Sequence, residues 1–296
     1  MTRPTAAPVT LFQRLANNGI DGLTLLVVPA ALFLLALFVY PFLYGLVLSF
    51  RPKLGGAFAN YARFFADPFL YQTIVTTLRL AVPVTLLNLV LAVPIALRVR
   101  LMQRQRLLTT ILVVPITLGT VLVAQGLLNY LGPQGWFNRT LIAIGLLSQP
   151  VRLLHNYWGV FLSLLITGLP FTFLLTLSYA SGVDPALENA AATLGAGAAA
   201  RFRTVLLPLL LPGLAITFCL SFVQAFSVFP SAILLGAPSG PTRVISIAAY
   251  EAAFEQYDYS LASAIAMLMG LVQLGVVAVV LVARGRLYRG ASGGKG

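Results

Sequence analysis

Long apolar runs alternate with short polar segments along most of the chain. Six runs are long enough to cross a bilayer, because about 20 apolar residues span its hydrocarbon core as a helix. They cover residues 23–50, 74–97, 107–128, 157–181, 209–235 and 260–283. The pattern predicts an all-α polytopic membrane protein. We expect a six-helix domain over residues 23–283, between tails at residues 1–22 and 284–296.

Polar side chains inside the predicted spans are candidates for a solute pathway. A polar group at membrane depth must face a water-filled path or pair with a neighbouring helix. The candidates are Asn88, Gln125, Ser221 and Gln224. A hydrogen bond between helices is the simpler explanation for each of them, and the sequence does not decide between the two.

The charge pattern predicts the orientation. The chain is 59% hydrophobic and 9% charged, with a formal net charge of +12. The basic residues lie in short loops between apolar runs, so we expect them to set topology and not to bind nucleic acid. The tails and loops on the side of the termini hold 12 Lys or Arg residues, and the opposite loops hold six. Positive residues accumulate on the cytoplasmic side, which predicts that both termini are cytoplasmic.

Residues for catalysis are scarce. The chain has one histidine, His155, and one cysteine, Cys219. It contains no phosphate-binding Gly-x-x-x-x-Gly-Lys-Ser/Thr sequence and no hydrolase motif such as His-Glu-x-x-His or Gly-x-Ser-x-Gly. These features predict a non-catalytic protein with no metal or cofactor of its own.

The segment 184–213 differs from the rest, because it carries acids, arginines and prolines between two apolar runs. It reads DPALENAAATLGAGAAARFRTVLLPLLLPG. Asp184 before a proline is a helix-start signal, and Glu188 in the first turns suits the positive end of the helix dipole. Gly195 can end that helix. A second helix is expected over residues 198–207, stopping at the next proline.

One face of the first short helix is formed by Leu187, Ala190, Ala191 and Leu194. Small residues on a helix face let another backbone approach closely. An amphipathic helix resting on lipid headgroups would explain the same pattern.

The spacing of this segment resembles the cytoplasmic "EAA" loop of the membrane permeases of ATP-binding cassette (ABC) importers. That pattern is Glu-Ala-Ala, three residues, Gly, nine residues, Ile, any residue, Leu-Pro. Here it is matched by Ala190, Ala191, Gly195, Val205 in place of Ile, and Leu207-Pro208. Asn189 departs from the pattern at the place of its Glu, and Glu188 lies one position earlier.

The resemblance implies the type I ABC importer permease fold, with six transmembrane helices and a cytoplasmic coupling helix, in a bacterial or archaeal inner membrane. It implies two ATPase subunits that bind ATP, a second permease subunit and an extracytoplasmic solute-binding protein as partners. The residues implied in ATPase coupling are Asp184, Leu187, Glu188, Asn189, Ala190, Ala191, Leu194, Gly195 and Arg201.

The Leu194-Gly195 pair is similar to the branch that imports polyamines, sulfate, molybdate, ferric ion or thiamine. The acidic outer loop over residues 236–258 would suit a cationic solute or contact the binding protein. Two alternatives remain: a secondary, gradient-driven transporter or channel, for which buried ionisable groups are expected, and a membrane-bound enzyme.

Overall fold

The computed structural model describes residues 22–289 of the 296, and all regular structure in that range is helical. Five helices are long and apolar enough to cross a membrane: Leu26–Ser49, Pro68–Val99, Tyr157–Ser181, Ala198–Phe226 and Tyr259–Arg286. A bent helix pair provides a sixth crossing if it counts as one span. The predicted all-α polytopic fold is confirmed. The predicted tail at residues 1–22 lies outside the described residues, except for Gly22.

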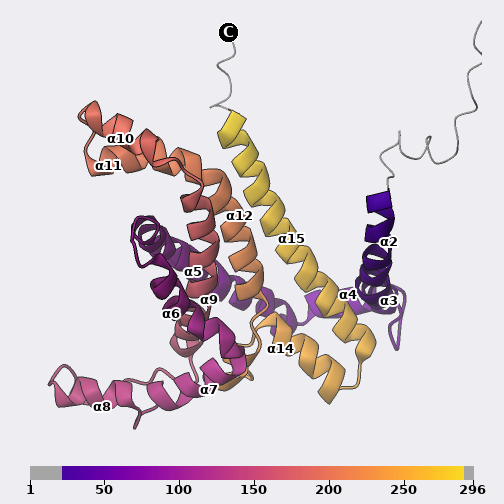
Figure 1. The fold of residues 1–296 in the computed structure, drawn as a ribbon. Helices are drawn as coiled ribbons and strands as arrows, with labels where there is room; N and C mark the ends of the chain where they lie inside the picture. Colours follow the sequence, from indigo (N-terminus) through magenta and orange to yellow (C-terminus); the bar gives the residue numbers. More distant parts are fainter. Residues whose placement is uncertain (1–21, 290–296) are drawn as a thin grey trace, which may run out of the picture.

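Three helices form the centre of the bundle (Figure 1). They are α5 (Pro68–Val99), α9 (Tyr157–Ser181) and α12 (Leu207–Phe226). The main core also draws on α14 (Ile245–Tyr250) and α15 (Tyr259–Arg289), and includes Leu80, Val84, Phe222, Phe226, Ile245 and Ile265. Lipid tails are as apolar as these side chains, so close packing rather than escape from water holds the helices together.

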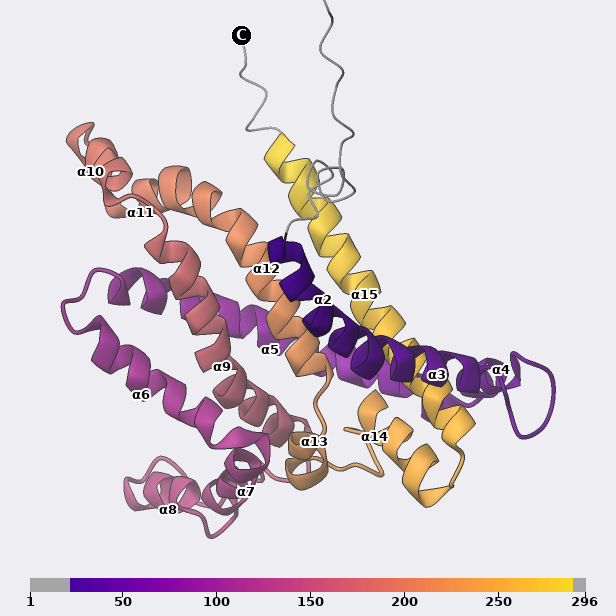
Figure 2. The ribbon, with the colours of Figure 1, turned by 45° about the vertical axis from the view of Figure 1, so that its right-hand side comes forward.

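The first span is an arm at the edge of the bundle. It consists of α2 (Gly22–Leu34), the π-helical segment η1 (Leu35–Val39) and α3 (Tyr40–Ser49). Its main packing partner is α15, beside which α3 runs (Figure 2). The short helix α4 (Ala59–Ala66) fixes the end of the arm, because Asn60 donates to the Ser49 carbonyl (3.0 Å) and the Tyr61 hydroxyl hydrogen-bonds the Ser49 hydroxyl (2.7 Å).

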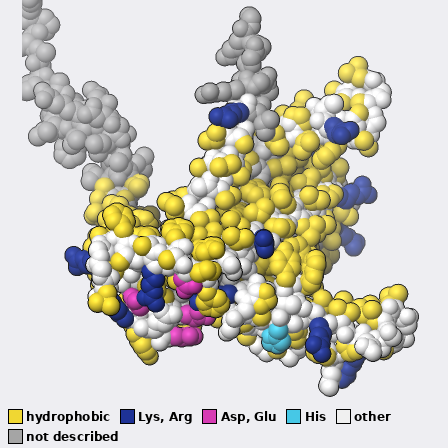
Figure 3. Space-filling view, turned by 180° about the vertical axis from the view of Figure 1, so that it is seen from behind, with side chains coloured by type: hydrophobic (Ala, Val, Ile, Leu, Met, Phe, Trp, Pro, Cys, Tyr) yellow, Lys and Arg dark blue, Asp and Glu magenta, His cyan; other side chains and the backbone are white. Residues whose placement is uncertain are grey.

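The two ends of the molecule carry different short helices (Figures 1 and 2). At one end lie the start of α2, the end of α15, and the helices α10 (Pro185–Thr193) and α11 (Ala198–Arg201). At the other lie α8 (Trp136–Ala143), α13 (Pro230–Leu235), α14 and the π-helical η3 (Glu251–Glu255). Apolar side chains cover the surface between these ends, and the acids gather at one end (Figure 3). α15 continues to Arg289, so residues 284–289 are helical although they were expected in a tail.

The third span is broken, which corrects the prediction of one continuous helix over residues 107–128. α6 (Gln105–Thr117) and the helical stretch that starts at Gly119 with α7 (Gly119–Leu131) are bent by 88° relative to each other. Gly119 has a φ of +73°, a backbone conformation that ends a right-handed helix and that glycine adopts without steric cost. Pro115, in the last turn of α6, also lacks the N–H for a helical hydrogen bond.

The expected stop near Pro208 was wrong. α11, the π-helical η2 (Phe202–Leu206) and α12 follow one another without a break, and the candidate span runs from Ala198 to Phe226. In the π-helical turn, the N–H of Leu207 donates to the carbonyl of Phe202, five residues back. Proline is tolerated at the start of a helical segment, and Pro208 lies in the first turn of α12, directly after this wider turn.

The far end of the fifth predicted span, 209–235, was also wrong. α12 ends at Phe226, and a separate helix, α13, begins at Pro230. A proline disfavours the helical conformation of the residue before it, and Phe229 has a φ of −137°. The break at residues 227–229 places Ser227 and Ser231 beside α5 and α9, in the lining of a cavity.

Candidate functional site

The helix α10 has the capped ends that the sequence predicts. The N–H of Ala186 donates to the carboxylate of Asp184 (2.8 Å), and Pro185 occupies the first turn. At the other end Gly195 takes a φ of +83°, and the N–H of Ala196 donates to the carbonyl of Ala191 (3.0 Å). Side-chain capping at the start and a left-handed glycine at the end make α10 a self-contained helix of nine residues.

Most of the residues that the resemblance assigns to coupling are exposed on α10. Leu187 is 47% exposed, and Leu194, at the tip, is 88% exposed. Asp184, Asn189, Ala190 and Gly195 are also exposed, whereas Glu188, Ala191 and Arg201 are partly buried. An exposed leucine beside small residues can insert into a groove of another protein. The coupling role of these residues stays a prediction.

Glu188 forms an ion pair with Arg100, the residue that directly follows α5. The same guanidinium donates from its Nη1 to the carbonyl of Ala180 in the last turn of α9 (2.9 Å). In the sequence, Arg100 is one of several arginines in a short loop, which are predicted only to set topology. The two partners are 88 residues apart in the chain, so no local motif indicates the pair.

A polar cavity opens to the surface of the chain where α5, α7, α9 and α12 meet the break at residues 227–229. Its volume is about 260 Å³, and its polar lining consists of Asn88, Thr120, Thr167, Ser221, Gln224, Ser227 and Ser231. No charged side chain lines it. The arrangement offers hydroxyl and amide groups to a solute.

Asn88 is held in this cavity by its fit against α9. The side chain is 2% exposed, and its Nδ2 lies 3.5 Å from the carbonyl of Leu164, at the limit of a hydrogen bond. Its Oδ1 has no partner among the described residues. A Cβ at Gly168 would lie 2.5 Å from the Asn88 Nδ2, so only glycine leaves room for the amide.

The structure separates the four pathway candidates. Asn88, Ser221 and Gln224 line the cavity, whereas Gln125 lies outside it; Asn88 and Ser221 are buried, and both glutamines are exposed. The Ser221 hydroxyl also hydrogen-bonds that of Thr172 on α9 (2.9 Å), so it joins two helices as well as lining the cavity. The break at residues 227–229, which the sequence analysis missed, adds Ser227 to the lining.

The acids of the outer loop are largely engaged within the chain. Arg243, 5% exposed, pairs with Glu251 through its Nε (3.1 Å), and its guanidinium lies 3.9 Å from the centre of the Phe69 ring. Asp258 is 7% exposed; its carboxylate accepts from the N–H of Leu261 (3.1 Å) and lies 3.5 Å from the Arg63 guanidinium. These contacts link η3, α4 and the start of α5, and they engage two of the three acids of the loop, whereas Glu255 is exposed.

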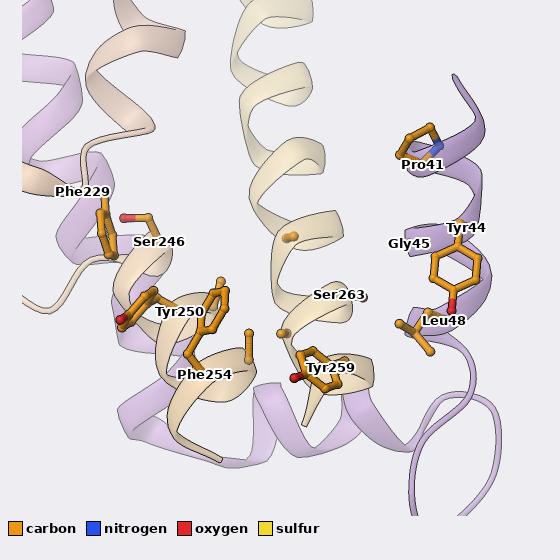
Figure 4. Close-up of a pocket in the computed structure, with 14 residues that line it drawn as sticks. Pro41, Tyr44, Gly45, Leu48, Phe229, Ser246, Tyr250, Phe254, Tyr259 and Ser263 are labelled. Atoms are coloured by element: carbon orange, nitrogen blue, oxygen red, sulfur yellow. The ribbon is translucent and has the colours of Figure 1, made fainter. Parts of the chain in front are cut away.

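A larger, mainly apolar pocket of about 890 Å³ separates α3 from α14, η3 and the start of α15 (Figure 4). Aromatic side chains line it from both sides, among them Tyr44, Tyr250, Phe254 and Tyr259. The sequence analysis did not identify this pocket, because its walls come from segments some 200 residues apart.

Comparisons with known proteins agree with this architecture. Residues 99–288 match the family model described as the inner membrane component of binding-protein-dependent transport systems. The spermidine/putrescine transport system permease protein PotB of Haemophilus influenzae is 30% identical, over 76% of this chain and 80% of that protein. PotB of Escherichia coli is 28% identical over 60% of this chain and 65% of its own length, and the probable sulfate transport system permease protein cysT of Prototheca wickerhamii is 27% identical over 57% and 65%.

Two solved structures share the fold. A bacterial ABC transporter that imports the acidic polysaccharide alginate contains a chain that is 22% identical, with a TM-score of 0.75, over 93% of this chain and 98% of that chain. The alginate transporter in complex with its pentasaccharide-bound periplasmic protein gives a TM-score of 0.76 at 23% identity, over 91% and 95% of the two chains. The family match covers well over half of the present chain, which therefore belongs to the inner membrane permease components of binding-protein-dependent ABC importers.

Proposed function

We propose that this protein forms one half of the solute pathway of an ATP-driven importer and couples that pathway to a separate ATPase through α10. The observation that supports the proposal best is α10 itself: a capped helix at one end of the bundle, with Leu194 88% exposed at its tip. A groove on the ATPase would receive this helix, and closure of two ATPase subunits would move it as a rigid lever.

The proposed assembly contains two ATPase subunits, which bind the ATP, a second permease subunit and an extracytoplasmic solute-binding protein. The present chain itself would be non-catalytic. A homologous partner and a second copy of this chain would both complete the pathway. Both termini would lie in the cytoplasm with α10, in agreement with the excess of Lys and Arg on that side.

Within this chain, the solute would pass the polar cavity beside Asn88, Ser221 and Gln224. The cavity lining holds no charged side chain, so hydrogen bonds would provide recognition here. Relatives named for spermidine/putrescine and for sulfate make a small polar solute the substrate class to test, with a polyamine first.

The importer proposal can be tested by gentle purification of the chain from its native membrane. We expect an ATPase to co-purify, and to be lost when residues 188–195 are replaced by a Gly/Ser linker. The matched control replaces residues 145–150, an exposed loop at the opposite end, and should retain the ATPase. Circular dichroism and size-exclusion chromatography check that both variants fold.

A chain that is well folded but never retains an ATPase would contradict the proposal. Uptake by proteoliposomes then distinguishes the alternative class: a secondary transporter or channel moves solute with an ion gradient and without ATP.

The pathway proposal can be tested by comparing two glutamines. Gln224→Ala removes an amide from the cavity lining, so we expect the KM for uptake to rise about tenfold, the cost of one or two lost hydrogen bonds. Gln125→Ala, outside the cavity, should leave KM unchanged. Equal KM values in both variants would exclude Gln224 from the pathway.

A further inference from the structure

Arg100 is unlike the other arginines of its loop. Its side chain is 4% exposed, whereas Arg98, Arg104 and Arg106 are all exposed. An arginine is rarely buried unless its charge is paired. The guanidinium contacts two partners from different helices, namely the Glu188 carboxylate on α10 and the Ala180 carbonyl at the end of α9. One side chain therefore joins the ends of α5, α9 and α10.

Few other contacts hold α10 to the bundle. Its principal packing partners are α11 and η2, the segments that follow it in the chain, and most of its residues are exposed. The Arg100–Glu188 pair is the only ion pair between α10 and the bundle within residues 22–289. The Ala180 carbonyl lies at the negative end of the α9 dipole, which favours a cation there.

The two helices joined to α10 through Arg100 also line the polar cavity, together with α7 and α12. α5 is continuous from Pro68 to Val99 and carries Asn88, and α9 carries Gly168 directly opposite. At about 1.5 Å per residue, Asn88 lies about 18 Å along the helix axis from Arg100. A displacement of α10 that is transmitted through the guanidinium would move the α5 and α9 walls of the cavity together.

We propose that Arg100 is a positioning residue, which ties α10 to α5 and α9 through Glu188 and Ala180 and so transmits the movement of α10 to the cavity. This inference rests on the proposed coupling function of α10. Arg100 does not contact solute or ATP. It keeps α10 at a fixed distance and angle from the bundle. ATP hydrolysis then moves the pathway, whereas without this contact α10 would move independently of the bundle.

The test measures ATP hydrolysed per solute imported, in complexes purified with their ATPase and binding protein and placed in proteoliposomes. We expect Arg100→Ala and Glu188→Gln each to raise this ratio about tenfold, within the range of known coupling energies. Arg98→Ala, two residues earlier and exposed, is the control and should leave the ratio unchanged. Arg100→Lys keeps the charge but cannot contact both partners with a planar fork. Its ratio should therefore lie between that of the unaltered protein and that of Arg100→Ala.

A double variant shows whether Arg100 and Glu188 act through their contact or independently of each other. If Arg100 and Glu188 act through their contact, Arg100→Ala/Glu188→Gln should be no worse than either single change. Additive effects, or a normal ratio in both single variants, would overturn the inference. If Arg100→Ala fails to fold, Glu188→Gln gives the same decision, because it keeps the Arg100 bond to Ala180. Failure of the coupling function itself looks different, since the unaltered complex would then import no solute on addition of ATP.

Discussion

Gly168 is the residue that leaves space for Asn88 in the polar cavity. An added methyl group would lie 2.5 Å from the Asn88 amide nitrogen, well inside van der Waals contact. We therefore expect Gly168→Ala to push the amide out of position, at a cost of about 1–3 kcal/mol in stability for the overpacked contact. Thermal unfolding and the initial rate of uptake measure the two effects, and we expect uptake to fall several-fold in complexes that still assemble.

The control for this substitution is Gly270→Ala on α15. A methyl group there meets no atom within 4 Å, and alanine is the better helix former. Uptake and unfolding temperature should remain at or slightly above those of the unaltered protein. If Gly168→Ala behaves like this control, the cavity does not depend on the position of Asn88.

At the scale of an element, the end of α10 depends on the backbone of Gly195. Its φ of +83° is unfavourable for any residue with a Cβ, although open space surrounds the position. We expect Gly195→Ala to cost about 1 kcal/mol, to loosen the turn after α10 and to reduce uptake without unfolding the spans. In the same complex, solute uptake should then fall while ATPase activity continues.

Gly197 provides a matched control for that change. It lies two residues further on, also has open space around it, and has an ordinary φ of −65°. Gly197→Ala adds the same methyl group without backbone strain, so coupling should remain normal. Equal uncoupling in both variants would show that bulk at the loop, and not the left-handed turn, matters.

The sequence predicts the helical elements better than their breaks. Apolar runs are sufficient to locate the spans, and the Asp-Pro and glycine signals are sufficient to delimit α10. Proline does not predict a break by itself, because α5 continues through Pro83 and Pro94, whereas the third span bends by 88° after Pro115. Neighbouring helices can satisfy a backbone interrupted by proline, and that depends on contacts that a local pattern does not contain.

The same limit applies to the candidate site. The sequence identifies Asn88, Ser221 and Gln224 as polar residues at membrane depth, but it gives Gln125 equal weight, because exposure to the cavity depends on the bend before α7. Arg100 and Arg98 are likewise indistinguishable in an arginine-rich loop. Only the approach of the ends of α9 and α10 to α5 buries one of them and leaves the other exposed.

At the scale of the whole molecule, the two ends of the bundle differ in ways that predict an orientation. The described start of α2 and the end of α15 lie on the side of α10, and α8, α14 and η3 lie on the opposite side (Figures 1 and 2). The predicted loops and tails on the side of α10 hold the excess of Lys and Arg in the sequence. If an ATPase meets α10, that side must face the cytoplasm, and the paired acids Glu251 and Asp258 must face the solute-binding protein.

Labelling of single cysteines tests this orientation directly. The native Cys219 is buried on α12 and can be replaced by alanine. A cysteine at Leu194, 88% exposed on the α10 side of the isolated chain, should react with a membrane-impermeant maleimide in inside-out vesicles and not in spheroplasts, when the chain is produced without the ATPase that would cover α10. One at Tyr257, 67% exposed at the opposite end, should react in spheroplasts only. Detergent solubilisation should make both react, which confirms that the membrane and not the fold provides protection. The reverse pattern would place α10 outside the cell, where there is no ATPase for it to meet, and would exclude the importer mechanism together with the orientation.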